Sequence, residues 1–346
     1  MKFAPAPRHA VLFAALATAG VTHAQDANKT QPGKTKELQT VVVTGTRMTD
    51  RTVAFSMAPI DVLTPKDLEQ TGATNLASAL RTLLPSFNFP QPSITDATDA
   101  IQPAQLRGLS PDETLVLING KRQHTTAIVN INGTLGRGSS PVDLNAIPIN
   151  AISRIEVLRD GAAAQYGSDA IAGVINIILK GGNHGGSVSA GIGQYSTHNS
   201  ANGRTVTGGA DGGIPLGQKG WIYLSADYMH QDPTNLAGPD KRFPADPTYD
   251  TVTFHYGLPL LKQKNAAVNM QYDLTPHVQF YAFSVFNKRN VSAGGFFRSL
   301  STYDTKSPAA VAVYPAGTCR WRTVRFWIHR LSRESAARCW MAGTTT

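Results

Sequence analysis

Hydrophobic positions follow different periods in the two halves of the chain, and the clearest pattern of the first half spans residues 152–180. Two segments rich in β-branched residues stand there on either side of a glycine-containing connector, which predicts a pair of strands. In the first segment Ile155 and Val157 alternate with Arg154 and Glu156. We therefore expect one face of that strand to enter a core and the other to carry charge.

Two short helices are predicted upstream of this strand pair. Thr64 precedes Pro65, and Asp67 stands where it can complete a capping box, so a helix is expected to begin there. Thr74 can cap a second helix, whose leucines recur with a period of about 3.6 residues. Pro85 should end that helix.

A further strand of the buried type is predicted at residues 114–118, and it ends at Asn119-Gly120. This dipeptide is typical of a tight hairpin turn. With the helices and the strand pair, it predicts a compact α+β domain over residues 48–182. A domain of this size can bury its own core.

From residue 183 onward the pattern changes to two-residue alternation, as in residues 222–228. The alternating runs have roughly the ten residues that a tilted strand needs to cross a bilayer. A soluble β-sandwich would alternate in the same way, but the long polar excursion at 231–250 and the tight turn at 275–276 favour a barrel. We expect a partial antiparallel transmembrane β-barrel over residues 183–318. Four aromatic residues are candidates for its girdles: Trp221, Tyr228, Tyr272 and Tyr281.

The first 24 residues have the order of a secretory signal peptide. Lys2 and Arg8 precede a short apolar run, and cleavage is expected after Ala24. A buried N-terminal helix is the alternative, since the run is too short to cross a bilayer as a helix. The polar residues 25–37 are expected to form a flexible arm of the exported protein.

Composition narrows the function classes. The chain of 346 residues carries a net charge of +9, of which residues 1–24 contribute +2 and residues 319–346 contribute +5, so the body carries only +2. Nucleic-acid binding loses its main support, because the body has no basic stripe with interleaved aromatic residues. Both cysteines, Cys319 and Cys339, lie near the C-terminus, so the body has neither a disulfide framework nor a cysteine-based metal site.

The segment RIEVLRDGAAAQYGSDAIAGVINI, at residues 154–177, resembles the end of the plug domain of TonB-dependent outer-membrane receptors. A βαβ-like piece of a soluble α/β domain is the alternative. The resemblance implies that the domain at residues 48–182 sits inside a barrel and that its charged side chains contact the barrel wall. The residues that match such contact positions are Arg107, Arg154, Glu156 and Arg159. In a soluble domain they would be surface charges.

A second resemblance concerns residues 38–47, ahead of this domain. Adjacent valines between threonines form an extended segment of strong β-propensity, which suits addition to the sheet edge of another protein. The segment resembles the TonB box, through which the energy-coupling protein TonB pulls on these receptors, and an ordinary first strand is the alternative. The residues concerned are Thr40, Val41, Val42, Val43, Thr44 and Gly45. We expect them to lie on a free tether.

The resemblance stops near residue 318. Residues 319–346 hold six arginines, both cysteines and three of the four tryptophans without clean alternation. They predict either out-of-frame translation or a basic amphipathic helix on a membrane surface. Receptors of this family close a barrel of about 22 strands, and an open sheet leaves edge groups that lipid cannot satisfy. We therefore expect a C-terminally truncated chain that does not transport by itself.

The resemblance implies a non-enzymatic receptor in the outer membrane that takes up a scarce ligand. The expected partners are TonB, outer-membrane lipid and a small ligand such as a ferric siderophore, cobalamin or an oligosaccharide, with no cofactor, metal site or nucleic acid. The ligand site would lie on apex loops near residues 93–105 and 130–140. A secreted or surface β-rich adhesin is the rival interpretation. An exported hydrolase has little support, since no HExxH motif or Gly-x-Ser-x-Gly elbow occurs.

Overall fold

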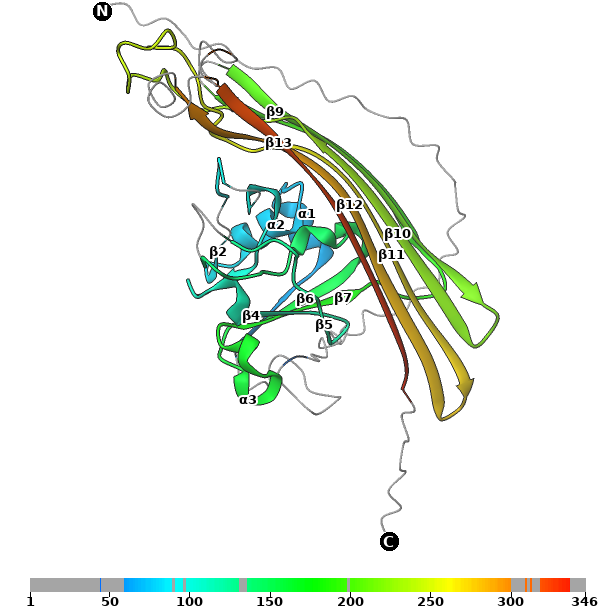
Figure 1. Ribbon diagram of the computed structural model, residues 1–346. Helices are drawn as coiled ribbons and strands as arrows, with labels where there is room; N and C mark the ends of the chain where they lie inside the picture. The colour runs from blue at the N-terminus through cyan, green and yellow to red at the C-terminus, as the bar shows by residue number, and fades with distance from the viewer. Residues whose placement is uncertain are drawn as a thin grey trace, which may run out of the picture. The chain divides into compact units, whose positions relative to one another are not determined.

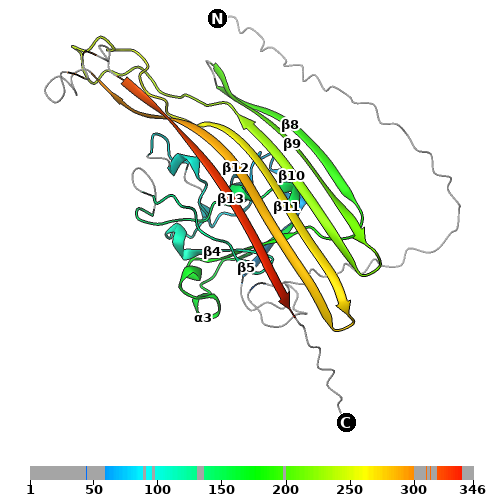
Figure 2. The same ribbon diagram turned by 45° about the vertical axis from the view of Figure 1, so that its right-hand side comes forward.

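The computed structural model describes residues 44, 59–88, 91–95, 98–130, 136–197, 200–299, 309, 312 and 318–336. Two sheets dominate it (Figure 1). A five-stranded sheet lies within residues 59–182, which we call the N-terminal domain, and a six-stranded sheet within residues 186–336 is called the large sheet. Figure 2 shows the strands of the large sheet side by side, with the N-terminal domain against one of its faces. None of the helices in the described ranges is long and apolar enough to cross a membrane.

The N-terminal domain is built on a mixed sheet with the strand order β1-β6-β7-β4-β5, in which β4 and β7 are parallel. Its strands are β1 (Ile60–Leu63), β4 (Thr114–Ile118), β5 (Lys121–Arg122), β6 (Ile152–Leu158) and β7 (Gly173–Leu179), beside the separate pair β2 (Phe87–Asn88) and β3 (Gln105–Leu106). Its α-helices are α1 (Pro65–Gln70), α2 (Leu76–Leu83) and α3 (Ala163–Tyr166). Short 3-10 turns join them: η2 (Thr98–Ala100), η3 (Pro111–Glu113), η4 (Leu144–Ala146), η5 (Ile149–Ala151) and η6 (Ser168–Ala170).

Both predicted helices form. The Thr64 side chain accepts a hydrogen bond from the backbone N–H of Asp67, and the Asp67 carboxylate accepts one from the Thr64 backbone N–H, so the capping box is confirmed. Hydrogen bonds from the Thr64 hydroxyl and backbone lower the pKa of Asp67. The N-cap of α2 is Asn75, whose side chain reaches the N–H of Ser78. The prediction of Thr74 at that position is therefore wrong by one residue.

The predicted hairpin turn and the predicted core are also present. Asn119 and Gly120 join β4 to β5 with φ values of 48° and 75°, as a type I′ turn requires. Leu80 of α2 packs with Ile155 of β6 in the main core, and Phe283 of the large sheet belongs to the same cluster. The N-terminal domain and the large sheet thus share one hydrophobic core.

The large sheet is antiparallel throughout, in the order β13-β12-β11-β10-β9-β8. Its strands are β8 (Gly186–Thr197), β9 (Ser200–Leu216), β10 (Gly220–Gln231), β11 (Leu260–Thr275), β12 (Val278–Arg298) and β13 (Thr318–Ala336). The connections from β9 to β10 and from β11 to β12 are tight, whereas residues 232–259 form a long excursion between β10 and β11. Short turns at one end and a long excursion at the other are typical of membrane-spanning barrels.

Side chains on β10–β12 alternate between two environments. Odd-numbered residues such as Tyr223 and Phe283 are buried toward the N-terminal domain, while even-numbered residues such as Leu224 face away. Trp221 and Tyr281 have the odd parity, and the Trp221 ring lies against Gly181. The prediction that these two belong to an aromatic girdle is therefore wrong. Tyr228 and Tyr272 have the even parity that the girdle requires.

Thr318–Ala336 pairs with β12 as strand β13. Its register runs from Thr318 opposite Arg298 to Ala336 opposite Gln279. The basic amphipathic helix considered for this stretch is therefore wrong, because the backbone continues the large sheet.

Gly173, at the start of β7, has no room for a side chain. Its φ is +140°, and an added Cβ would lie 2.4 Å from the carbonyl oxygen of Leu158. We predict that Gly173→Ala lowers the free energy of unfolding of the N-terminal domain by about 3 kcal/mol or more, because backbone strain and overpacking add. Urea denaturation of the full chain, followed by protease resistance of this domain, measures the loss. Gly72→Ala is the control: φ is +64° with nothing within 4 Å, so about 1–2 kcal/mol is expected, and equal losses would contradict us.

Candidate functional site

Thr44 is the one residue of the predicted partner-binding tract that the structure describes, and it is buried against β6 and β7. Its backbone N–H and its hydroxyl both donate to Oε2 of Glu156, at 2.9 and 2.6 Å. The same hydroxyl accepts from Nδ2 of Asn176 at 3.0 Å. The rest of the tract lies outside the described residues: Thr40, Val41, Val42, Val43 and Gly45. The prediction of a tract that is free along its whole length is therefore wrong at Thr44.

Glu156 is fully buried even though it lies on the predicted charged face of β6. The Nε of Arg154 donates to Glu156 Oε1 at 2.9 Å, so Arg154 holds one carboxylate oxygen and Thr44 holds the other. The predicted alternation is confirmed, because Ile155 and Val157 enter the core. Thr44 covers Glu156 on the face that was predicted to carry charge.

The charged residues expected to contact a barrel wall have their described ion pairs inside the N-terminal domain. Arg107 lies 3.9 Å from Asp160, and Arg159 lies 2.7 Å from Asp61; Arg154 pairs with Glu156 as above. Contact with a barrel wall stays a prediction for these four residues, because the large sheet is open and forms only part of such a wall. Since β6 turns its apolar face toward the core shared with the large sheet, its charged face points away from that sheet.

A buried ion pair joins the N-terminal domain to the large sheet. Nη1 of Arg289, on β12, lies 2.6 Å from Oδ2 of Asp143, and the two side chains are 2% and 3% exposed. Arg289 also donates to the side chain of Gln263 at 2.8 Å and to the carbonyl oxygen of Ala100 at 3.0 Å. A buried charge is tolerated where it is paired and hydrogen-bonded. The pair therefore fixes β12 against the loops of the N-terminal domain.

Asn145 extends this contact to β11 and α2. Its side chain accepts from the N–H of Ala77 at 3.2 Å and also bonds to the side chain of Gln102. Its carbonyl oxygen accepts from Gln263 at 2.6 Å and from Asn265 at 3.4 Å. One asparagine thus ties the beginning of a helix and a loop of the N-terminal domain to a strand of the large sheet.

A second ion pair between the two sheets involves Lys180 and Asp211. Nζ of Lys180, which follows β7, lies 3.0 Å from Oδ1 of Asp211 on β9. Asp211 also accepts hydrogen bonds from the hydroxyls of Ser187 and Tyr223, each at 2.5 Å. The Asp211 side chain is 1% exposed, and three donors satisfy it.

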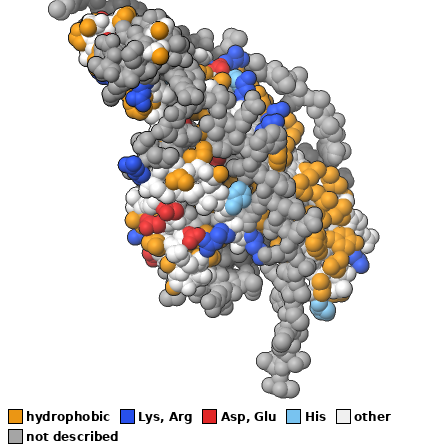
Figure 3. All heavy atoms as spheres, in the orientation of Figure 1, with side chains coloured by type: hydrophobic (Ala, Val, Ile, Leu, Met, Phe, Trp, Pro, Cys, Tyr) orange, Lys and Arg blue, Asp and Glu red, His pale blue; other side chains and the backbone are white. Residues whose placement is uncertain are grey.

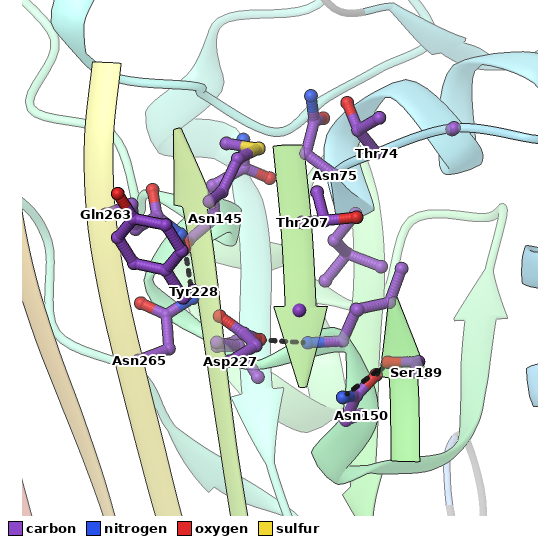
Figure 4. Close-up of a pocket in the computed structure, with 16 residues that line it drawn as sticks. Thr74, Asn75, Asn145, Asn150, Ser189, Thr207, Asp227, Tyr228, Gln263 and Asn265 are labelled. Carbon is purple, nitrogen blue, oxygen red and sulfur yellow. Dashed lines mark hydrogen bonds between the residues drawn. The ribbon is translucent and has the colours of Figure 1, made fainter. Parts of the chain in front are cut away.

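A small cavity of about 110 Å³, lined by both polar and apolar side chains, lies between the N-terminal domain and β8–β11. In Figure 4, Thr74 and Asn75 from the start of α2 lie at one end of the cavity and Asp227 on β10 at the other, where its carboxylate accepts from the N–H of Ile149 at 3.1 Å. The polar side chains in this lining could bind ordered water. In the part of the chain that the structure describes, no three His, Cys, Asp or Glu side chains are grouped so that they could hold a metal ion.

The N-terminal domain also meets the long excursion between β10 and β11. The Ser93 hydroxyl donates to the Gly257 carbonyl oxygen at 3.0 Å and accepts from the Gly257 N–H at 3.1 Å. Next to it, Ile94 packs with Phe254. The Arg242 guanidinium lies over the Phe254 ring, 4.6 Å from its centroid. A predicted apex loop therefore joins a cluster that is both aromatic and basic.

Residues 52–174 match the family model described as the TonB-dependent Receptor Plug Domain. The matched residues include β1, β4 and β6, the strands that carry the core and the Glu156 contact. This chain belongs to the TonB-dependent receptor family. The N-terminal domain is its plug domain.

Curated relatives of this TonB-dependent receptor chain are much longer than it is. The vitamin B12 transporter BtuB of Vibrio cholerae is 34% identical over 203 residues, which are 58% of this chain and 28% of that protein. The probable TonB-dependent siderophore receptor PirA of Acinetobacter baumannii is 34% identical over 150 residues, 43% of this chain and 19% of that protein. The chain thus matches about a quarter of the length of these relatives.

Solved receptor structures share the fold. A ferric enterobactin receptor from Pseudomonas aeruginosa superposes with a TM-score of 0.53 at 20% identity, covering 68% of this chain and 33% of that one. The siderophore receptor PirA from Acinetobacter baumannii gives 0.52 at 22% identity, with 80% and 38% covered. The predicted fold class is confirmed: a plug domain is followed by antiparallel strands of the receptor-barrel type, here in an open sheet.

The residues that join plug and large sheet were missed in the sequence. Arg289 has the same strand parity as Phe283 and Val285, so a charge on the inward face of a strand was an available signal. Asp143 and Asn145 stand before and within a single 3-10 turn, and no periodic pattern marks such residues.

We predict that Arg289→Met lowers the free energy of unfolding by about 3–5 kcal/mol, because Asp143 would stay buried without its partner. The double variant Arg289→Met/Asp143→Leu should recover most of this loss, since neither charge remains. Urea denaturation of the detergent-solubilised chain measures all three proteins.

Lys241→Met is the control for this series. Lys241 pairs with Asp250 at the surface, where the side chains are 64% and 53% exposed, and exposed pairs contribute less than about 1 kcal/mol. An Arg289→Met loss no larger than that of the control would contradict the assignment.

Proposed function

We propose that this chain is the plug-bearing part of an outer-membrane receptor that takes up a scarce small ligand with energy delivered by TonB. One observation carries the proposal: the tract that resembles a TonB box is bonded through Thr44 to the plug, and the plug is bonded to a sheet of membrane-type strands. A pull on the tract would therefore reach Glu156 on β6 first. No catalysis is required.

TonB would bind residues 40–45 by adding them as a strand to one of its own sheets. Thr44 must leave Glu156 and Asn176 before its backbone can pair with TonB. Two of its three hydrogen bonds go to a carboxylate, and bonds to charged groups contribute about 1.5–3 kcal/mol each. The hydrogen bonds of Thr44 to Glu156 and Asn176 therefore act as a latch: breaking them costs a few kcal/mol. Arg154 still pairs with Glu156 after release.

The ligand would bind where the plug loop at residues 91–95 meets the excursion at residues 232–259, within the first of the two predicted apex regions. Arg242 and Tyr256 offer an exposed guanidinium and an exposed ring, both held against the buried Phe254 ring, and these groups suit a flat, anionic metal chelate. Hydrogen bonds from Arg242 hold the pKa of Asp240 well below its usual range, so this corner stays ion-paired at neutral pH. Relatives named for vitamin B12 and for a siderophore support a chelate over an oligosaccharide.

We predict that Val42→Pro abolishes capture of the purified periplasmic domain of TonB by the immobilised chain. Proline cannot donate a backbone hydrogen bond, so a strand addition centred on the tract fails. A pull-down or surface plasmon resonance measures capture. Capture that is unchanged by Val42→Pro would refute the proposal and favour the rival interpretation of a surface adhesin, in which this tract has no partner.

We predict the opposite effect for Thr44→Val, which removes the hydroxyl at nearly constant volume. Loss of the two hydroxyl bonds, to Glu156 and to Asn176, weakens the hold on the tract while the backbone bond to Glu156 stays, and about 1.4 kcal/mol of weakening should raise TonB capture roughly tenfold. Thr82→Val is the matched control, because the Thr82 hydroxyl bonds only within α2, to the Ser78 carbonyl oxygen at 3.1 Å. Equal capture by both variants would show that the latch does not limit access.

A further inference from the structure

Asn176 of β7 links the docked Thr44 to the turn between β4 and β5. Its side-chain nitrogen, Nδ2, donates to the hydroxyl of Thr44 at 3.0 Å, and its side-chain oxygen, Oδ1, accepts from the backbone N–H of Gly120 at 3.0 Å. The residue is 1% exposed, so water does not readily replace either partner. One buried carboxamide therefore holds Thr44 with one end and the turn with the other.

The same turn contacts the large sheet through Asn119. Nδ2 of Asn119 donates to Oδ1 of Asn269 on β11 at 3.3 Å, and Oδ1 of Asn119 accepts from the backbone N–H of Leu179 at 2.9 Å. Three asparagine side chains, from β7, from the turn and from β11, thus connect Thr44 to a strand of the large sheet. Contiguous hydrogen bonds of this kind can carry coupling between distant groups.

The contact between Asn119 and Asn269 has little packing around it. A cavity of about 670 Å³ borders it and is lined also by Gln271 and Gly181, and both asparagines are only half-buried. Regions with few buried apolar contacts open locally at a low cost in free energy. The opposite face of the large sheet is apolar, as the hydrophobic side chains at the right of Figure 3 show, so the polar groups of this contact lie on the side that faces the plug.

The plug is held more firmly at another point of β11. Gln263, which accepts from Arg289, stands six positions before Asn269, and six positions are about 20 Å along a strand. The pair of Arg289 with Asp143 is almost completely buried, and breaking such a pair is costly. The contact at Asn269 can therefore open while the buried ion pair stays closed.

We propose that Asn176 is a positioning residue that transmits the release of Thr44 to the turn between β4 and β5. When Thr44 leaves, the buried Nδ2 of Asn176 loses its acceptor and must find another, so the carboxamide turns away from Gly120. The freed turn then parts from Asn269, and the cavity beside it widens, while the buried ion pair holds the plug in place. TonB as the agent of release rests on the proposed function, whereas the link from Thr44 to the turn does not.

Hydrogen exchange of the detergent-solubilised full chain, resolved to single amides by mass spectrometry, tests the proposal. The reporters are the N–H groups of Gly120 and Leu179, which bond to asparagine side chains of this series. Thr44→Val should speed exchange of both roughly tenfold, the effect of weakening one hydrogen bond by about 1.4 kcal/mol. The N–H of Ala77 bonds to the side chain of Asn145 in the same way, at 3.2 Å, and should keep its rate. Unchanged rates at both reporters, or an equal increase at Ala77, would overturn the proposal.

Two variants show whether the effect runs through Asn176. Thr82→Val is the matched control, because the Thr82 hydroxyl bonds only within α2, and it should leave all three amides unchanged. In Asn176→Ala the N–H of Leu179 should already exchange fast, and adding Thr44→Val should not raise that rate further, since the two changes act on one route. A further increase in the double variant would overturn the role of Asn176.

A last measurement uses the unmodified chain and does not depend on folding of a variant. The purified periplasmic domain of TonB, at a concentration that saturates capture, should speed exchange of Gly120 and Leu179 and leave Ala77 unchanged. Capture without this change would overturn the present proposal alone. Absence of capture would refute the proposed function alone, and the comparison of Thr44→Val with Thr82→Val would then decide the present proposal.

Discussion

Buried polar groups must find partners, and this requirement governs how the plug lies against the large sheet. Arg289 and Asp143 are almost completely buried between them, and Asn145 bonds to both a helix of the plug and β11. Apolar packing through Phe283 adds contact area but does not by itself fix the orientation of the plug. The hydrogen bonds supply the direction, because a shift of the plug by one strand position would leave several of these groups unpaired.

The same requirement acts at the other face of the plug sheet. Glu156 is buried, and its two carboxylate oxygens accept hydrogen bonds from Arg154 and Thr44. Without Thr44, which belongs to the preceding tract, the plug would lose the donors that Thr44 gives to Oε2 of Glu156. This contact couples the end of the tract to β6, and Ile155 and Val157 of β6 enter the core that includes Phe283 of the large sheet. A continuous set of contacts thus connects the tract to the strands. Such coupling is a physical route for a pull, because each step is a packed or bonded pair.

The large sheet meets two different environments because strand side chains alternate. Its inward face carries polar residues such as Gln263 and Asn265, which bond to the plug. Its outward face is apolar up to Lys264 and Lys288. The strand face on which a charged residue lies therefore decides its role. Arg289 faces the plug and pairs with Asp143, while the neighbouring Lys288 faces away from the plug.

Local sequence patterns were enough to predict much of the secondary structure and the family. The capping box at Thr64, the Asn119-Gly120 turn, the alternation of β6 and the antiparallel strands follow from neighbouring residues, and the segment at residues 154–177 identified the family. Only the tertiary structure decided that Thr44 docks on Glu156, that Arg107 and Arg159 pair within the plug, and that Arg289 meets Asp143. Secondary structure is encoded by contacts within a few residues, whereas these pairs join residues 53 to 146 positions apart. Which of many charged residues become partners depends on which faces the fold buries together, and no local pattern records that.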